Sequence, residues 1–167
     1  MSATERRPRI GDRAPSFSLP GPDGAPVTLE ELRARGTVVL YFYPRDSTAG
    51  CTVEACSFRD AHADFVAAGA LVVGVSRDDQ ASHQRFAAEH RLPFLLLSDP
   101  TGETHARYGV RRMMGGLLSD RITFVIDRGG VVRGVFNSLL RFSAHARSAL
   151  EVVRALAAGD PAGASLR

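Results

Sequence analysis

The chain has 167 residues, 44% of them hydrophobic, which is enough to bury the core of one domain. The formal net charge is only +3, and the basic residues, all of them arginine, are spread among 18 acidic ones without forming a stripe. This pattern argues against a nucleic-acid surface, and no run approaches the roughly 18 apolar residues of a membrane span. We therefore expect a cytoplasmic protein with no nucleic-acid or membrane partner.

The first half of the chain predicts two strands joined by a helix. Residues Gly11–Pro26 are rich in glycine and proline, which is typical of an extended segment or an edge hairpin. Thr37–Tyr43 and Ala70–Val75 are continuous apolar runs of strand length, so we expect both strands to be covered on two faces. Between them, Cys51–Ala68 has apolar positions compatible with one helix, which Gly69 would end.

The second half predicts an antiparallel hairpin between helices. We expect a helix at Gln80–His90, a short apolar run at Phe94–Leu97 before a turn at Ser98–Pro100, strands at Ile122–Ile126 and Val131–Phe136, and a last helix at Ser143–Ala158. The two strands are joined by Asp127–Gly130, whose glycines tolerate positive φ. The last helix is amphipathic, with an apolar stripe formed by Ala146, Ala149, Leu150, Val153 and Leu156.

These elements favour an α/β fold of the thioredoxin-like type, with a central mixed sheet flanked by helices. The strand–helix–strand unit predicts a right-handed parallel crossover, to which an antiparallel hairpin and a closing helix are added. Several other mixed α/β folds share the same elements. We expect a single domain over residues 1–158 and a disordered tail over residues 159–167.

The cysteines suggest the chemistry. The chain has only two, Cys51 and Cys56, and they lie too close in sequence to join distant parts of a fold. Pro44 ends a predicted strand, and a loop of small polar residues leads to Cys51 in the first turn of a predicted helix, where the free N–H groups and the helix dipole favour a thiolate. Thr48 could place a hydroxyl beside the sulfur, or it could simply cap the helix.

The stretch from Pro44 to Cys51 resembles a known signature. Pro44, Thr48 and Cys51 are similar to the peroxiredoxin pattern Pro-x-x-x-Thr-x-x-Cys, and FYPRDSTAGCTVEAC, with Cys56 five residues on, resembles the peroxiredoxin Q group, also called bacterioferritin comigratory proteins, of the atypical 2-Cys type. The opening GDRAPSFSLPGPDG and the segment RITFVIDRGG are also similar to that group. The resemblance runs from about residue 11 to residue 156.

The resemblance implies roles for several further residues. Arg121 would be the active-site arginine, stabilising the negative charge that develops on the leaving oxygen of a peroxide. Glu54 would orient that arginine, although it could equally be an exposed helical carboxylate. Tyr43 would line the pocket, although an aromatic residue at a strand end is often part of the core. The segment Met113–Gly116 departs from the loop that we expect at this place in the group.

Cys56 would be the resolving cysteine, which converts a sulfenic acid on Cys51 into an intramolecular disulfide. The alternative is an inert buried thiol. A zinc site is disfavoured, because Cys-x4-Cys with no close pair of histidines does not provide four ligands. The five histidines are scattered, and we expect them at the surface, with His145 at a helix start. No cofactor is expected.

The resemblance therefore implies a thiol peroxidase that reduces hydrogen peroxide or organic hydroperoxides and is re-reduced by thioredoxin or a similar dithiol. One alternative is a thiol–disulfide oxidoreductase, which the absence of Cys-x-x-Cys disfavours. A second alternative is a redox sensor or holdase that uses the Cys51 and Cys56 pair. No large apolar stripe is left over, so we expect a monomer. The sequence does not identify the preferred peroxide or the physiological reductant.

Overall fold

A five-stranded mixed sheet forms the centre of the protein, whose computed structural model describes residues 6–113 and 118–159. The strand order is β5-β4-β3-β8-β9. The strands β3 (Thr37–Phe42), β4 (Ala70–Ser76) and β5 (Leu95–Ser98) run parallel, whereas β8 (Ile122–Ile126) is antiparallel to β3 and to β9 (Val132–Asn137). The predicted mixed sheet, the parallel crossover and the antiparallel hairpin are thus confirmed.

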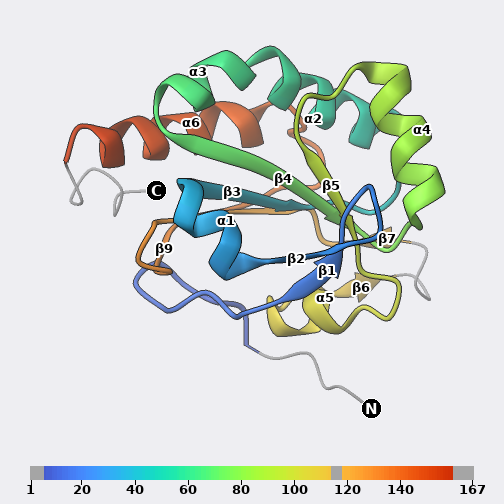
Figure 1. Cartoon of the computed structure of the whole chain (residues 1–167), viewed down its shortest axis with the longest axis horizontal. Helices are drawn as coiled ribbons and strands as arrows, with labels where there is room; N and C mark the ends of the chain where they lie inside the picture. The colour runs from blue at the N-terminus through green and yellow to red at the C-terminus, as the bar shows by residue number, and fades with distance from the viewer. Residues whose placement is uncertain (1–5, 114–117, 160–167) are drawn as a thin grey trace.

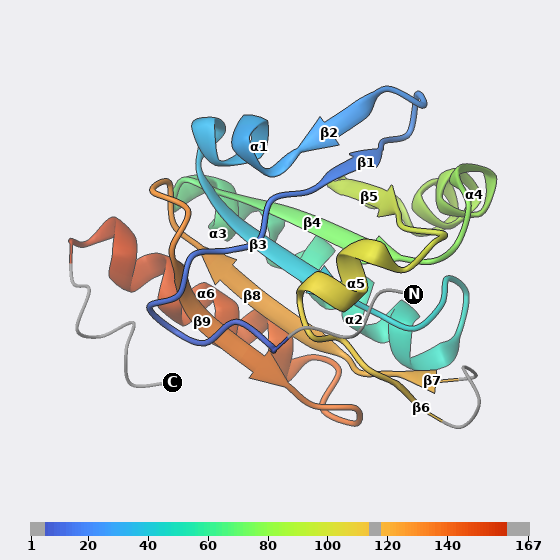
Figure 2. The same cartoon turned by 90° about the horizontal axis from the view of Figure 1, so that it is seen from below.

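Helices cover both faces of this sheet (Figures 1 and 2). One face packs against α2 (Ala49–Asp60), α3 (His62–Ala67), α4 (Gln80–His90) and α6 (Ala144–Ala157). On the other face lie α1 (Leu29–Arg35), α5 (Glu103–Arg107) and the amino-terminal hairpin. No helix in the described part of the chain is both long and apolar enough to span a membrane.

The alternation of side chains along β3 explains its continuous apolar sequence. Val39 and Tyr41 belong to the core beneath α2 and α6, whereas Val38, Leu40 and Phe42 belong to the core on the side of α1. All five are fully buried, because a central strand covered on both faces has no side facing water. This strand therefore leads the chain through the middle of the protein to the loop before Cys51.

Short elements complete the fold. β1 (Ser18–Pro20) and β2 (Pro26–Thr28) form the expected edge hairpin, and β6 (Arg112–Met113) pairs with β7 (Leu118–Ser119). The helices α1 and α5 and the β6–β7 pair were not predicted. Of the unusual segment Met113–Gly116, only Met113 lies within the described residues. In the predicted tail, residues 160–167 lie outside them, so that prediction is not tested.

The prediction of one helix over Cys51–Ala68 is wrong in two respects. The helix α2 already begins at Ala49, and the helical segment divides at Ala61 into α2 and α3. The sequence around Ala61 has no glycine or proline to signal a break. On either side of it, Phe58 and Phe65 bury their rings in the same core, 5.9 Å apart, so packing rather than local propensity decides this geometry.

Candidate active site

Cys51 lies at the amino-terminal end of α2, soon after β3. The strand ends at Phe42, and Pro44, which has no N–H to continue the ladder, follows two residues later. Thr48 is the N-cap residue of α2, and the first bond of the helix runs from the N–H of Thr52 to the carbonyl of Thr48, at 2.9 Å. The N–H of Cys51 is therefore one of the backbone amides at the start of the helix that have no partner within it. This positive helix end favours a thiolate.

Arg121 and Glu54 form a buried trio with Cys51. Arg121 immediately precedes β8, which pairs with β3, so the sheet brings it to the end of β3 from which Cys51 is presented. Its Nη2 donates to Cys51 Sγ at 3.4 Å, and its Nη1 donates to Glu54 Oε1 at 2.8 Å. The exposed fractions are 1% for Cys51, 0% for Glu54 and 5% for Arg121. The sheet thus brings Arg121 to two residues of α2 that lie about 70 positions earlier in the sequence.

Burial and the charges of neighbouring groups set the pKa values of Glu54 and Arg121. Burial raises the pKa of Glu54 to about 8, although the charge of Arg121 and its hydrogen bond oppose this shift. Burial alone would lower the pKa of Arg121, but the charges of Glu54 and Cys51 outweigh it and raise that pKa. The guanidinium is therefore a permanent cation, while Glu54 holds its proton much more readily than an exposed carboxyl group. A protonated Glu54 leaves more of the charge of Arg121 to a thiolate at Cys51.

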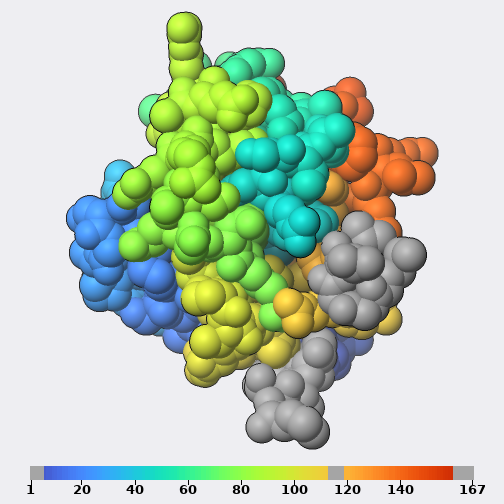
Figure 3. All heavy atoms as spheres, turned by 90° about the vertical axis from the view of Figure 1, so that its right-hand side faces the viewer, coloured from blue at the N-terminus to red at the C-terminus, as the bar shows by residue number. Residues whose placement is uncertain are grey.

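A cavity of about 340 Å³ opens over the sulfur. It is lined by Pro44, Arg45, Thr48, Gly50, Cys51, Arg121, Leu139, Leu140 and Phe142. Figure 3 shows the face of the molecule on which the start of α2 (cyan) and the residues after β9 (orange) lie side by side. The ring of Phe142 lies over Arg121, 4.8 Å from Cζ, and a Cβ on Gly50 would approach this ring to 2.6 Å. Glycine at position 50 therefore allows the pocket wall to close over the arginine.

Thr48 lines this cavity but does not cap the helix. Its side chain makes no N-cap hydrogen bond, and Oγ1 instead donates to the carbonyl of Arg45 at 3.0 Å. The capping interpretation of Thr48 is therefore wrong, although the residue does occupy the N-cap position. Its hydroxyl oxygen keeps lone pairs for a hydrogen-bond donor that enters the cavity beside Cys51.

Tyr43 and Cys56 lie outside the cavity. Tyr43 is buried, and its hydroxyl donates to Asp46 Oδ1 at 2.5 Å, so the predicted role in lining the pocket is replaced by a place in the core. Cys56 is half-buried on α2, and both thiols are free. Standard helix geometry puts Cα atoms five residues apart at about 8.7 Å. A disulfide needs less than about 7 Å, so the intact helix holds Cys51 and Cys56 too far apart to bond.

His145 is a buried neighbour of the trio that the sequence did not reveal. Its Nε2 donates to the carbonyl of Ser138 at 2.9 Å, and its Nδ1 lies 2.8 Å from Thr123 Oγ1 and 3.6 Å from Glu54 Oε2. Burial lowers the pKa of His145, which keeps the ring neutral with the proton on Nε2. In the described part of the chain, Glu54 Oε2 accepts no hydrogen bond.

The prediction that the histidines lie at the surface is wrong for three of them. His83, His105 and His145 are all buried. Each ring faces an oxygen atom supplied by tertiary structure, which the sequence does not show. Only the placement of His145 on the apolar stripe of α6, next to Ala146 and Ala149, could have indicated its burial.

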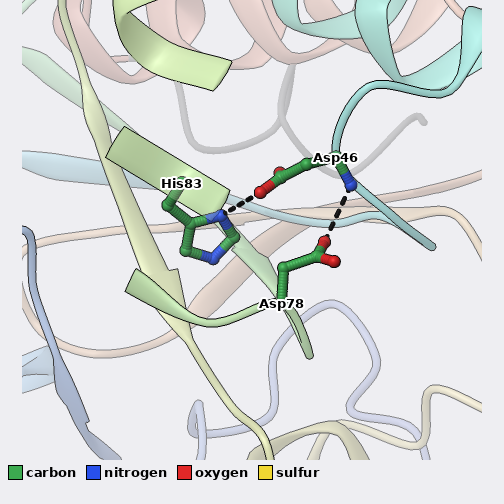
Figure 4. A group of neighbouring side chains, drawn as sticks. All are labelled: Asp46, Asp78 and His83. Atoms are coloured by element: carbon green, nitrogen blue, oxygen red, sulfur yellow. Dashed lines mark hydrogen bonds and ion pairs between the residues drawn. The ribbon is translucent and has the colours of Figure 1, made fainter. Parts of the chain in front are cut away.

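One group in the described part of the chain has the composition of a metal site. Ligand atoms of Asp46, Asp78 and His83 lie within 4.8 Å of one another (Figure 4). Their oxygen atoms already accept hydrogen bonds from Tyr43, Ser76 and Ser82 and from the N–H of Asp46 itself. Because protein donors occupy these lone pairs, the group is better described as a hydrogen-bond network than as a cation site.

Comparison with known proteins gives consistent matches. The model of the AhpC/TSA family matches residues 10–135. Peroxiredoxin Q, chloroplastic, of Oryza sativa subsp. japonica is 42% identical over 146 residues, which are 87% of this chain and 67% of that protein. The structure of peroxidoxin BcpB from Mycobacterium tuberculosis has a TM-score of 0.85 and 41% identity over 90% of this chain and 99% of that one. Xanthomonas campestris bacterioferritin comigratory protein has a TM-score of 0.76 and 32% identity over 84% of this chain and 92% of its own.

Proposed function

The chain belongs to the AhpC/TSA family and to its peroxiredoxin Q group, and from this we propose that it is a thiol-dependent peroxidase whose nucleophile is Cys51. The observation that carries the proposal is the contact between Arg121 Nη2 and Cys51 Sγ at the base of an open cavity. A thiolate, a fixed cation and room for a small substrate are the parts that peroxide reduction requires.

In the first step the thiolate of Cys51 attacks one oxygen of a hydroperoxide. A sulfur–oxygen bond forms, the O–O bond breaks, and the other oxygen leaves as an alkoxide or hydroxide that takes up a proton. Cys51 becomes a sulfenic acid, and the peroxide is reduced to an alcohol or to water. Negative charge moves from sulfur to the leaving oxygen during this step, and Arg121 is placed to stabilise both.

In the second step the thiol of Cys56 attacks the sulfur of the sulfenic acid, which releases water and forms a Cys51–Cys56 disulfide. A dithiol protein of the thioredoxin kind then donates two electrons, which restores both thiols and leaves the reductant as a disulfide. The short sequence spacing of the cysteines supports this assignment, since no other cysteine exists in the chain. The separation within α2 requires that the helix opens first.

The walls of the cavity support reduction of organic hydroperoxides as well as hydrogen peroxide. Leu139, Leu140 and Phe142 form an apolar side, and Leu140 is 83% exposed. An alkyl group could bury part of its surface there while the peroxide group reaches Cys51. The related Xanthomonas campestris protein is described by its alkyl peroxide reduction activity.

A reducing compartment, the cytoplasm, is the proposed location. Cys51 and Cys56 must return to free thiols in each cycle, and thioredoxin-type reductants maintain thiols there. The relative from Oryza sativa is named as a chloroplastic protein. Fractionation of cells that produce the chain, with an antibody against it, tests this part of the proposal.

A coupled assay tests the activity directly. The purified protein is mixed with thioredoxin, thioredoxin reductase, NADPH and either hydrogen peroxide or tert-butyl hydroperoxide, and the oxidation of NADPH is followed. The proposal expects turnover with both peroxides, and loss of at least nine-tenths or so of it in Cys51→Ser, because a serine hydroxyl is a poor nucleophile at neutral pH. A redox sensor or holdase would oxidise Cys51 once without sustained NADPH consumption.

A further inference from the structure

The loop before Cys51 is tied to distant parts of the fold by a buried hydrogen-bond cluster (Figure 4). We call residues 44–48 the approach loop, because they connect β3 to α2. At its middle, Asp46 directs its carboxylate towards His83 on α4. Its Oδ2 lies 2.7 Å from His83 Nδ1, and its backbone N–H donates to Asp78 Oδ2 at 2.7 Å. The side chains of Asp46 and His83 are 2% and 3% exposed.

The cluster continues into the sheet, so it is a rigid support rather than a surface contact. His83 Nε2 faces the carbonyl of Leu97 on β5 at 3.1 Å. Ser82 on α4 donates to Asp46 Oδ2 at 2.8 Å, and Ser76 at the end of β4 donates to Asp78 Oδ2 at 2.7 Å. Bonds of this kind are strongest where they are buried, as the two contacts of His83 are here.

The hydrogen-bond cluster holds the loop as far as Asp46, and the next residue has an unfavourable backbone conformation. Ser47 has φ of 61°, in the left-handed region, which a residue with a Cβ adopts only at some cost. Thr48 then returns to an extended conformation as the N-cap of α2. A fixed point at Asp46 and an unfavourable backbone at Ser47 together form a hinge next to the segment that must open for disulfide formation.

We propose that Asp46 and His83 are positioning residues that clamp the approach loop, so that Thr48 and Cys51 face the peroxide correctly and the opening of α2 starts after Asp46. The inference builds on the proposed peroxidase function. Neither residue lines the cavity, so both act through the loop. The clamp also confines the conformational change, because the chain before Ser47 stays attached to α4 and β5 while Cys51 moves.

The variant His83→Gln tests the clamp. A glutamine can still donate to the carbonyl of Leu97, but it loses the ring nitrogen that faces Asp46. The matched control is His105→Gln. His105 is an equally buried ring paired with Asp99 at 2.6 Å, and it lies on α5 across the sheet from α4. Both variants remove one buried His–Asp contact, so similar losses of thermal stability are expected.

Only His83→Gln should slow the chemistry. Because small misplacements of reacting groups are costly, the second-order rate constant of Cys51 with hydrogen peroxide should fall by about tenfold or more in this variant and by less than about twofold in His105→Gln. Equal effects in the two variants would overturn the proposal. If His83→Gln does not fold, Ser82→Ala removes a single donor to Asp46, and it should lower the same rate constant by a few-fold; an unchanged constant would count against the clamp.

Amide hydrogen exchange tests the clamp without any assay of activity. The N–H of Asp46 is bonded to Asp78, so its exchange rate reports on the fixed point directly. It should be equally protected in the reduced and disulfide forms of the wild type, while the amides of residues 52–56 lose protection on oxidation, and it should lose protection in reduced His83→Gln. Loss of Asp46 protection on oxidation of the wild type would overturn the clamp. A wild-type protein that reduces no peroxide would defeat the proposed function alone.

Discussion

The guanidinium of Arg121 is shared between Cys51 Sγ at 3.4 Å and Glu54 Oε1 at 2.8 Å. As the thiolate attacks, the cation stabilises charge that leaves the sulfur for the departing oxygen. Arg121→Ala should therefore lower the second-order rate constant with hydrogen peroxide by about 10², the usual cost of losing one preorganised charge-stabilising group. Stopped-flow mixing of the reduced protein with peroxide measures this constant. Arg107→Ala, at an exposed ion pair with Glu103, is the control, and an equally small effect in both variants would contradict the role of Arg121.

Glu54 makes the stability of the reduced protein depend on pH. Burial raises the pKa of Glu54 to about 8 from an ordinary value of 4.5, so between these pH values the folded state keeps a proton that the unfolded state has released. Stability therefore falls as pH rises through this window, by at most about 1.4 kcal/mol per pH unit for one proton. Glu54→Gln, which carries no titrating proton, should gain stability relative to the wild type as pH rises.

Urea unfolding of both reduced proteins at several pH values between about 5 and 8 measures this difference. His145, whose pKa is lowered by burial, contributes a loss of stability towards acid pH in both proteins. The comparison therefore isolates the contribution of Glu54. If the free energies of unfolding of the two proteins differ by the same amount at every pH in this window, the carboxyl group of Glu54 is ionised throughout.

The residues of the site differ in how far the sequence predicts them. Cys51, Thr48 and Arg121 follow from short motifs, and the structure brings all three to one cavity. The hydrogen-bond partners of His83 and His145 come from other parts of the fold, so no local sequence pattern predicts the roles of these two residues. The resemblance implies that Tyr43 lines the pocket, but the strand alternation turns its ring into the core.

At the scale of elements, α2 is the part that must change during the catalytic cycle. Its helix holds the two cysteine Cα atoms about 8.7 Å apart and turns the side chains roughly 140° from each other. Disulfide formation therefore requires its first turn to unwind. Cys56→Ser should leave the reaction of Cys51 with peroxide unchanged within about twofold, because Cys56 lies outside the cavity, but it should abolish thioredoxin-dependent turnover.

Mass spectrometry after peroxide treatment checks this prediction. The variant should accumulate sulfinic and sulfonic acid at Cys51, whereas the wild type should show a Cys51–Cys56 disulfide. A variant that keeps full turnover would show that the reductant attacks the sulfenic acid directly.

The long elements were predictable, whereas the short helices α1 and α5 and the β6–β7 pair were not. β3, β4, β8 and β9 are dense in β-branched and aromatic residues, and β3 and β4 are covered on both faces, so their sequences mark them clearly. The helices α1 and α5 have only seven and five residues, too few for a helical period to stand out. The division at Ala61 depends on packing beneath α2 and α3.

At the scale of the molecule, the residues of the active site lie at one end of the sheet. β3 and β4 run parallel, and their carboxyl ends carry Pro44 and Asp78, whereas β8 is antiparallel and contributes Arg121 from its amino-terminal end. Mixed strand directions thus let loops from both halves of the chain meet around Cys51. The reduced and disulfide forms should share this scaffold and differ around α2.

The protein should be a monomer in both redox states. A stable interface buries about 1,000 Å² or more and has an apolar centre. Among the described residues, the large hydrophobic side chains with substantial exposure are Val53, Val66, Leu139 and Leu140, divided between α2, α3 and the loop after β9. Leu139 and Leu140 already line the cavity. Sedimentation equilibrium of the reduced and oxidised protein should give the mass of one chain. A dimer that dissociates in Leu140→Asp would contradict this and place an interface beside the active site.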